Sequence, residues 1–75
     1  MRAYVLVTVG SGKARDVARK ILAMPWVKMA NACWGDSDVY VVVEVPSGGD
    51  LNALVADKLP QLEGVARTST HIVID

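Results

Sequence analysis

Seventy-five residues form one small domain, and a chain this short buries only about 60% of the surface that its unfolded state exposes, so its core alone is marginal. The chain has a single cysteine, Cys33, which excludes an internal disulfide, and a single histidine, His71, which argues against a metal site. Its net charge of +0 argues against the basic surface that nucleic-acid-binding proteins carry. Because 52% of the residues are hydrophobic and only 21% are charged, we expect a homo-oligomer that buries apolar surface between copies.

A first strand is predicted over Arg2–Val9. Its side chains alternate between two apolar faces, with Ala3, Val5, Val7 and Val9 on one and Tyr4, Leu6 and Thr8 on the other. This pattern is typical of a central strand. The same segment is too short to span a membrane and lacks the features of a signal peptide, so we expect a cytoplasmic protein without membrane contact.

A helix is predicted after Gly10-Ser11-Gly12, with Ser11 as its N-cap and Pro25 as the residue that ends it. Its apolar residues recur at helical spacing, at Ala14, Val17, Ala18, Ile21 and Leu22. Extended structure follows from Trp26 to Trp34, turns at Gly35–Ser37 and returns as Asp38–Val45. This hairpin ends in a second strand that is apolar on both faces.

A second helix is predicted after the loop Pro46–Gly49, with Asp50 as its N-cap and Pro60 as its stop. Its apolar positions are Leu51, Leu54, Val55 and Leu59. A turn at Glu63-Gly64 leads into a last strand within Leu62–Ile74. The order β-α-β-β-α-β predicts a ferredoxin-like α+β fold, in which both helices cover one face of a four-stranded antiparallel sheet.

The two strands that are apolar on both faces are the ones that this fold places in the centre of the sheet. One sheet face therefore remains without helices. It carries either Tyr4, Leu6 and Val42 or the opposite set, depending on the register. A second sheet stacked on that face, from another copy of the chain, would cover it.

Few residues could support catalysis. Ser69 and His71 share a strand face, so a dyad is geometrically possible, but a histidine without a chemical role fits the pattern as well. Cys33 reads as a small buried hydrophobe, and Gly10-Ser11-Gly12-Lys13 lacks the spacing of a phosphate loop. Tyr4 and Tyr40 occupy positions where RNA-binding folds place aromatic residues, but they lack basic neighbours and suit packing instead. We do not expect an enzyme.

The turn Gly35-Asp36-Ser37-Asp38 has two interpretations. Glycine and aspartate are common in hairpin turns, because they tolerate unusual backbone dihedrals and hydrogen-bond to nearby main chain. The same residues could hold a zwitterionic amino acid, since a carboxylate suits its ammonium group and backbone N–H groups suit its carboxylate. Residue types alone leave both interpretations open.

Several segments in series resemble one family. They are the strand Ala3–Val7, the segment Val27–Ala32 before the G-x-x-D turn Gly35–Asp38, the strand Val39–Val45, the run Leu59–Val65 and the threonine-rich end Thr68–Ile74. Together they resemble the effector-binding domain of the leucine-responsive and asparagine-responsive (Lrp/AsnC) regulators, also called the RAM domain for its role in regulating amino-acid metabolism. The resemblance covers nearly all of residues 1–75.

This resemblance implies a dimeric α+β barrel with sheets face to face, assembly of dimers into rings, and an amino-acid effector held between dimers without a cofactor. In that family the turn contributes effector contacts, which map onto Gly35, Asp36 and Asp38, with Trp34 close by. The last strand contributes through Thr68 and Thr70.

The family's transcription factors carry a helix-turn-helix before this domain, whereas this sequence begins within the first strand. The chain is therefore similar to the stand-alone form, for which we expect no direct DNA binding. The partners implied are a second copy, the effector and full-length regulators of the family. The alternative is a small dimeric α+β barrel enzyme of the monooxygenase or stress-responsive type, whose pocket lies between the helices and the sheet.

Overall fold

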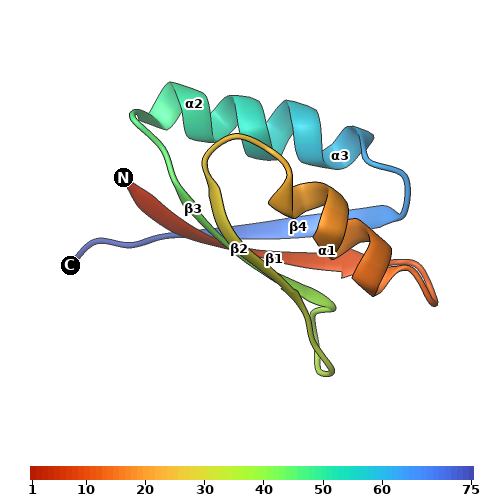
Figure 1. Cartoon of the computed structure of the whole chain (residues 1–75). Coiled ribbons are helices and arrows are strands. Elements are labelled where there is room, and N and C mark those ends of the chain that lie inside the picture. The colour runs from red at the N-terminus through yellow and green to blue at the C-terminus, as the bar shows by residue number, and fades with distance from the viewer.

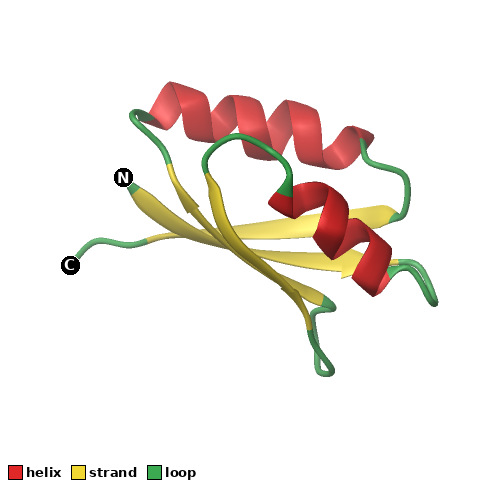
Figure 2. Cartoon of the chain, in the orientation of Figure 1, coloured by secondary structure: helices red, strands yellow, loops and turns green.

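The computed structural model describes residues 1–75 and shows four strands and two helical segments in the predicted order (Figure 1). The strands are β1 (Arg2–Val9), β2 (Val27–Ala32), β3 (Val39–Glu44) and β4 (Val65–Ile72). They form one antiparallel sheet in the order β2-β3-β1-β4. Both helical segments lie on the same side of the sheet (Figure 2). The ferredoxin-like α+β fold is confirmed, with the first and third strands in the centre.

The helices begin at different residues from those predicted. Helix α1 (Ala14–Leu22) has Lys13 at its N-cap, with no side-chain hydrogen bond there. Gly12 adopts a left-handed φ of 76°, which changes the direction of the backbone between Ser11 and the helix. The prediction of Ser11 as the N-cap was therefore wrong. The second helical segment is capped by Ser47 instead of Asp50, because the Ser47 hydroxyl accepts a hydrogen bond from the Asp50 N–H at 3.3 Å.

The second helical segment continues through Pro60, which the sequence pattern placed at its end. It consists of α2 (Gly48–Asn52), the π-helical η1 (Ala53–Lys58) and α3 (Leu59–Gln61), which follow one another without a break. In the wide turns, the Leu59 N–H donates to the Leu54 carbonyl, five residues back. Widening the helix before Pro60 makes room for a ring that would otherwise clash with the preceding turn. The prediction of Pro60 as a stop was therefore wrong.

The core lies between the helices and the sheet and contains only hydrophobic residues. Strand register places matching valines on this side, with Val5 opposite Val41 and Val7 opposite Val39. The thirteen buried residues are Ala3, Val5, Val7, Val17, Ala18, Ile21, Val39, Val41, Val43, Val45, Leu51, Leu54 and Leu59. No polar or charged residue is buried among them. Helix packing on one apolar sheet face therefore accounts for the whole core.

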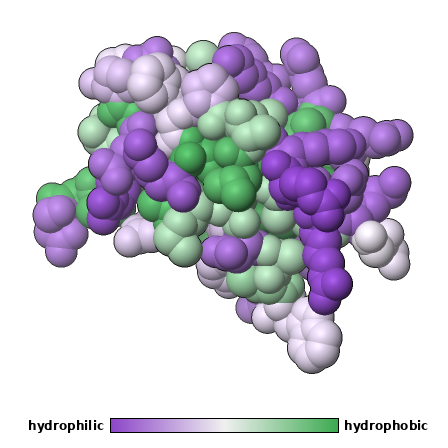
Figure 3. Space-filling model, in the orientation of Figure 1, coloured by the Kyte–Doolittle hydropathy of each residue, from purple (hydrophilic) through white to green (hydrophobic).

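The other side of the sheet, which we call the open face, is not covered by helices. It carries the alternate residues of the central strands, including the register pairs Tyr4 with Val42 and Leu6 with Tyr40. The structure thereby selects the first of the two sets that the sequence left open. Tyr4 and Tyr40 remain 45% and 44% exposed, whereas the valines behind them are buried. Figure 3 shows the chain from the side, in the orientation of Figure 1, with hydrophobic residues exposed near the centre of the view among hydrophilic ones.

An ion pair lies at one end of the open face. Arg2 and Glu44 are register partners on β1 and β3, and their side chains meet at 3.0 Å. The Arg2 guanidinium lowers the pKa of Glu44 by a hydrogen bond and by charge attraction, and Glu44 raises the pKa of Arg2 in the same way.

Truncating the core residue Ile21 should destabilise the fold strongly. Ile21 is 0% exposed, so Ile21→Ala removes buried methylene groups and leaves a cavity, which typically costs about 2–5 kcal/mol of unfolding free energy. Urea unfolding at a fixed protein concentration measures the loss. The matched variant Ile21→Val should lose only about 0.5–1.5 kcal/mol. Equal losses for the two variants would show that Ile21 is not packed as described.

Acidification should remove the contribution of the Arg2–Glu44 pair. Because the Glu44 pKa is lowered in the folded chain, this contribution is present above the ordinary glutamate pKa and disappears as the pH falls through the lowered value. The difference in thermal stability between the wild type and Glu44→Gln should therefore shrink over that acidic range. Melting both proteins at a series of pH values tests this. A difference that does not change with pH would contradict the pairing.

Candidate functional site

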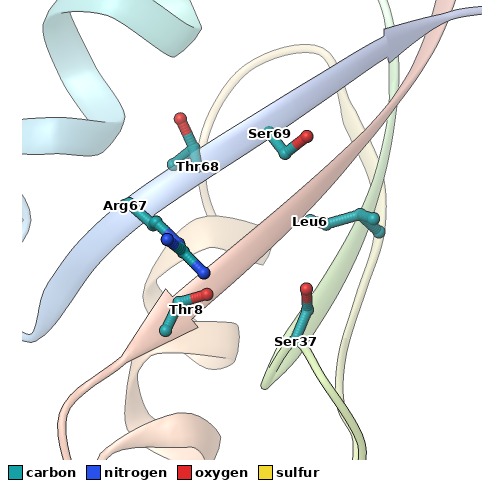
Figure 4. Close-up of a pocket in the computed structure, with 6 residues that line it drawn as sticks. All are labelled: Leu6, Thr8, Ser37, Arg67, Thr68 and Ser69. Carbon is teal, nitrogen blue, oxygen red and sulfur yellow. The ribbon is translucent and has the colours of Figure 1, made fainter.

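One cavity of about 400 Å³ opens on the open face, at the end of the sheet near the β2–β3 hairpin. Three parts of the chain meet there: the end of β1, the start of β4 and the hairpin turn. The lining residues are Leu6, Thr8, Ser37, Arg67, Thr68 and Ser69, as Figure 4 shows. Only Leu6 is hydrophobic, and the other five lining residues carry a hydroxyl group or a guanidinium group, so the cavity presents both polar and apolar surface.

Strand register brings the residues from β1 and β4 together. Leu6 lies opposite Ser69, and Thr8 lies opposite Arg67. Partners in an antiparallel pair point to the same face, so all four side chains belong to the open face. Thr68 lies opposite Val7, whose side chain is in the core, and its side chain points away from those of Arg67 and Ser69 (Figure 4). Thr68 thus borders the cavity because it lies between Arg67 and Ser69 on β4.

The hairpin is fastened to β1 by Asp38. The regular β1–β3 pairing reaches only to Val7 opposite Val39. Beyond it, the Asp38 N–H donates to the Val7 carbonyl, and the Val9 N–H donates to the Asp38 Oδ2, both at 2.9 Å. The carboxylate takes the place that a main-chain carbonyl would hold in a longer strand. It therefore fixes Ser37, the preceding residue, beside the end of β1.

The turn itself requires glycine at position 35. Gly35 has φ of 148°, a conformation that residues with a side chain rarely adopt. Its neighbours Trp34 and Asp36 are exposed, and the Trp34 side chain is completely so. The Cys33 N–H donates to the Asp38 carbonyl at 2.7 Å and closes the loop. The hairpin tip thus has a defined shape and presents Trp34 and Asp36 to solvent.

Of the predicted site residues, only Thr68 lines the cavity. Asp36 and Asp38 precede and follow the cavity residue Ser37 along the chain but are not part of the lining. Trp34 and Gly35 lie at the hairpin tip, outside the cavity lining. Thr70 is exposed, lies opposite Val5 in the register and does not line the cavity.

Sequence reasoning missed four polar residues of the cavity: Thr8, Ser37, Arg67 and Ser69. Part of the sequence pattern that could have identified them was present. Thr8 interrupts the apolar alternation of the first strand, and Arg67 and Ser69 alternate with Thr68 in the last strand. What the sequence could not supply is the register between β1 and β4, the first and last strands of the chain.

Side chains that could support chemistry are few. The Ser69 hydroxyl and the His71 Nε2 are 3.1 Å apart, so the contact that their shared strand face permits is present. Both residues are exposed, and no carboxylate hydrogen-bonds to the imidazole to orient it, as a catalytic triad requires. No group of three His, Cys, Asp or Glu side chains lies close enough to hold a metal ion.

The enzyme alternative places its pocket between the helices and the sheet. In this chain that space is filled by the hydrophobic core, and the cavity lies on the opposite side of the sheet. The geometry therefore offers no support for that alternative. None of the helices has the length and hydrophobicity needed to cross a membrane.

Comparison with known proteins relates the chain to transcriptional regulators. The family described as the Lrp/AsnC ligand binding domain matches residues 2–75. Two helix-turn-helix-type transcriptional regulators of Pyrococcus furiosus, an uncharacterized one and FL11, are each 32% identical over 95% and 96% of this chain. The chain spans about half the length of these relatives, 48% and 47%.

Solved structures share the fold along the whole chain. A hypothetical protein from Pyrococcus horikoshii is 37% identical, with a TM-score of 0.90 over 97% of this chain and 88% of that one. A transcriptional regulator from Neisseria meningitidis, solved as a complex with L-Met, is 21% identical, with a TM-score of 0.85 over 99% of this chain and 49% of that one. At that identity the second likeness concerns the fold alone.

Proposed function

This chain belongs to the Lrp/AsnC ligand-binding domain family, and from that premise we propose that it binds an amino acid as its effector at the hairpin end of the sheet. The observation that carries the proposal is the position of Asp38. Its carboxylate accepts a hydrogen bond from the Val9 N–H, and Asp38 directly follows Ser37, which lines the cavity. A carboxylate fixed next to a cavity residue suits the ammonium group of an amino acid.

The chemistry of the turn supports this assignment. Only the Oδ2 of Asp38 is engaged within the chain, which leaves Oδ1 able to accept a hydrogen bond from a ligand. Asp36 is exposed and adds negative charge to the same rim, and Gly35 allows a ligand to approach the main chain closely. Trp34 supplies an exposed aromatic surface next to them. The Neisseria regulator with the same fold was solved with L-Met.

The remaining predicted contacts, Thr68 and Thr70, belong to β4. Thr68 borders the cavity, and its hydroxyl projects from the other side of the strand. Thr68 and Thr70 lie opposite the core residues Val7 and Val5, so both belong to the helix side of the edge strand β4 and not to the open face. We therefore keep them as effector contacts that need a second copy of the chain.

We further propose that the chain functions as a homodimer with the two open faces in contact. The open face presents aromatic and aliphatic side chains that a lone chain would leave in water, such as Tyr4, Tyr40 and Met29. The thirteen-residue core is also small for independent stability. Rings of such dimers, and mixed assemblies with full-length regulators, would extend the same arrangement.

A regulatory role without catalysis follows from the same reasoning. The curated relatives are transcriptional regulators, and the site offers a binding cavity without an oriented nucleophile. With a net charge of +0, this chain itself has no electrostatic footprint for DNA, so we propose that it acts in the cytoplasm by sensing an effector.

Removing the charge of Asp38 should abolish effector binding without unfolding the protein. In Asp38→Asn an amide oxygen can still accept from the Val9 N–H, but the attraction for an ammonium group is lost, at a cost of about 1.5–3 kcal/mol of affinity. A thermal-shift screen of the wild type against the twenty amino acids identifies the effector. The same effector should give little or no shift with Asp38→Asn.

Two further variants separate binding from folding. Asp38→Ala also removes the acceptor for Val9 and should melt lower by an amount equivalent to about 1 kcal/mol. Asp36→Asn, at the exposed neighbour, should retain most of the thermal shift. Full effector affinity in Asp38→Asn would place the site elsewhere, and unfolding of that variant would return Asp38 to a purely structural role.

A charge in the middle of the open face should prevent dimer formation. Val42 lies opposite Tyr4 in the centre of that face, so Val42→Asp would bury an unpaired carboxylate between two sheets, at a cost of several kcal/mol. Light scattering should show a dimer for the wild type and a monomer, folded or unfolded, for the variant. Leu6→Asp should behave in the same way.

The matched control adds the same charge away from the open face. Asn52 is exposed on α2, so Asn52→Asp should leave the dimer intact. A wild-type chain that is a stable folded monomer at micromolar concentration would refute the dimer.

A further inference from the structure

We propose that the cavity on the open face is a carboxylate-binding pocket with Arg67 as its anion clamp. The inference deepens the proposed function, on which it rests for the identity of the ligand as an amino acid. It assigns the two charged groups of that ligand to opposite sides of the cavity. The carboxylate would meet Arg67 on β4, and the ammonium group would meet the aspartates of the hairpin.

Arg67 is placed for this role by the sheet register. It lies opposite Thr8, and its side chain extends from β4 toward Thr8 on β1 (Figure 4). No carboxylate lies within ion-pairing distance of it, because the three ion pairs of the chain join Arg2 to Glu44 and both Arg19 and Lys20 to Asp16. The Arg67 guanidinium makes no hydrogen bond within the chain. Its donors are therefore available at the cavity.

Hydroxyl groups surround this cation. Thr8, Ser37 and Ser69 come from three different parts of the chain and line the same cavity. A hydroxyl can donate to a carboxylate oxygen that the guanidinium already holds, and a planar guanidinium matches the two oxygens of a carboxylate. Leu6 is the only hydrophobic residue of the lining, and the other five carry hydrogen-bonding groups that suit a small molecule with a polar end.

The charge balance favours a carboxylate over a phosphate. Arg67 is the only charged residue in the lining, and Asp36 and Asp38 are the chain neighbours of the lining residue Ser37. A phosphate dianion would leave one charge uncompensated beside a single cation, whereas the single charge of a carboxylate matches it. A zwitterion satisfies both sides at once. The volume of about 400 Å³ is in the range of small-molecule pockets.

Titration with a minimal carboxylate tests the pocket without knowledge of the effector. Sodium propionate is added to the ¹⁵N-labelled protein at constant ionic strength, and amide NMR signals are followed. Saturable shifts are expected for Leu6, Thr8, Ser37 and Ser69. Propionamide, which has nearly the same shape but no charge, should cause no such shifts. Equal effects of the two compounds, or no shifts with propionate, would overturn the proposal.

Variants assign the binding to Arg67. Arg67→Gln should weaken propionate binding by about tenfold or more, because it removes the charge-assisted hydrogen bonds. Arg67→Lys should lie between this variant and the wild type, since an ammonium group keeps the charge but loses the bidentate geometry. The control Arg15→Gln removes an equally exposed arginine from α1 and should change nothing. Unchanged affinity in Arg67→Gln, or tighter binding of inorganic phosphate than of propionate, would refute a carboxylate pocket at Arg67.

The carboxylate pocket and the amino-acid effector can be refuted independently of each other. If propionate binds at Arg67 but no amino acid stabilises the protein, the pocket stands and the amino-acid effector is refuted. If an amino acid stabilises the protein equally in the wild type and in Arg67→Gln, the effector stands and the carboxylate pocket is refuted.

Discussion

The pairing of β1 with β3 is the constraint on which the rest of the structure depends. Its register places Val5 against Val41 and Val7 against Val39 on the helix side, and it sends every alternate residue to the open face. A slip by one residue would exchange the two faces, and the valines would leave the core for solvent. The helices can then pack only on one side. The same register also determines which residues of β1 reach the cavity, because Leu6 and Thr8 lie on the face opposite the valines.

Asp38 connects the pairing of β1 and β3 to the candidate site. Main-chain pairing stops at Val39, yet the hairpin remains attached to β1 because the Asp38 side chain accepts from Val9. In the proposed site the two oxygens of this carboxylate would not compete, since Oδ2 holds the chain and Oδ1 makes no hydrogen bond within it. The residue that fastens the hairpin to β1 is thus the one that directly follows the cavity residue Ser37.

How far the sequence predicts the structure depends on how local each feature is. Alternation along β1 and β3 and helical spacing around Ile21 are local patterns, so fold class and strand order were predictable, whereas the choice of which strand face meets the helices was left open. The helix ends were not, because Gly12 and Pro60 act through backbone geometry that composition does not reveal. The carboxylates of the turn were recognisable as a motif. Arg67 was not, because its relation to Thr8 exists only once β4 has paired with β1.

The proposed ligand site and the proposed dimer contact lie on the same face of the sheet, so ligand binding and dimer formation would be linked thermodynamically. The cavity opens on the open face, which is also the face proposed to contact a second copy. A ligand held there would lie beside the partner sheet, in surroundings less polar than water, where each charge-assisted contact is stronger. Any difference in ligand affinity between monomer and dimer must appear as an equal change in dimer affinity. If both proposals hold, a cavity in this position would couple effector binding to assembly without a moving part, which is the kind of coupling that a regulatory domain needs.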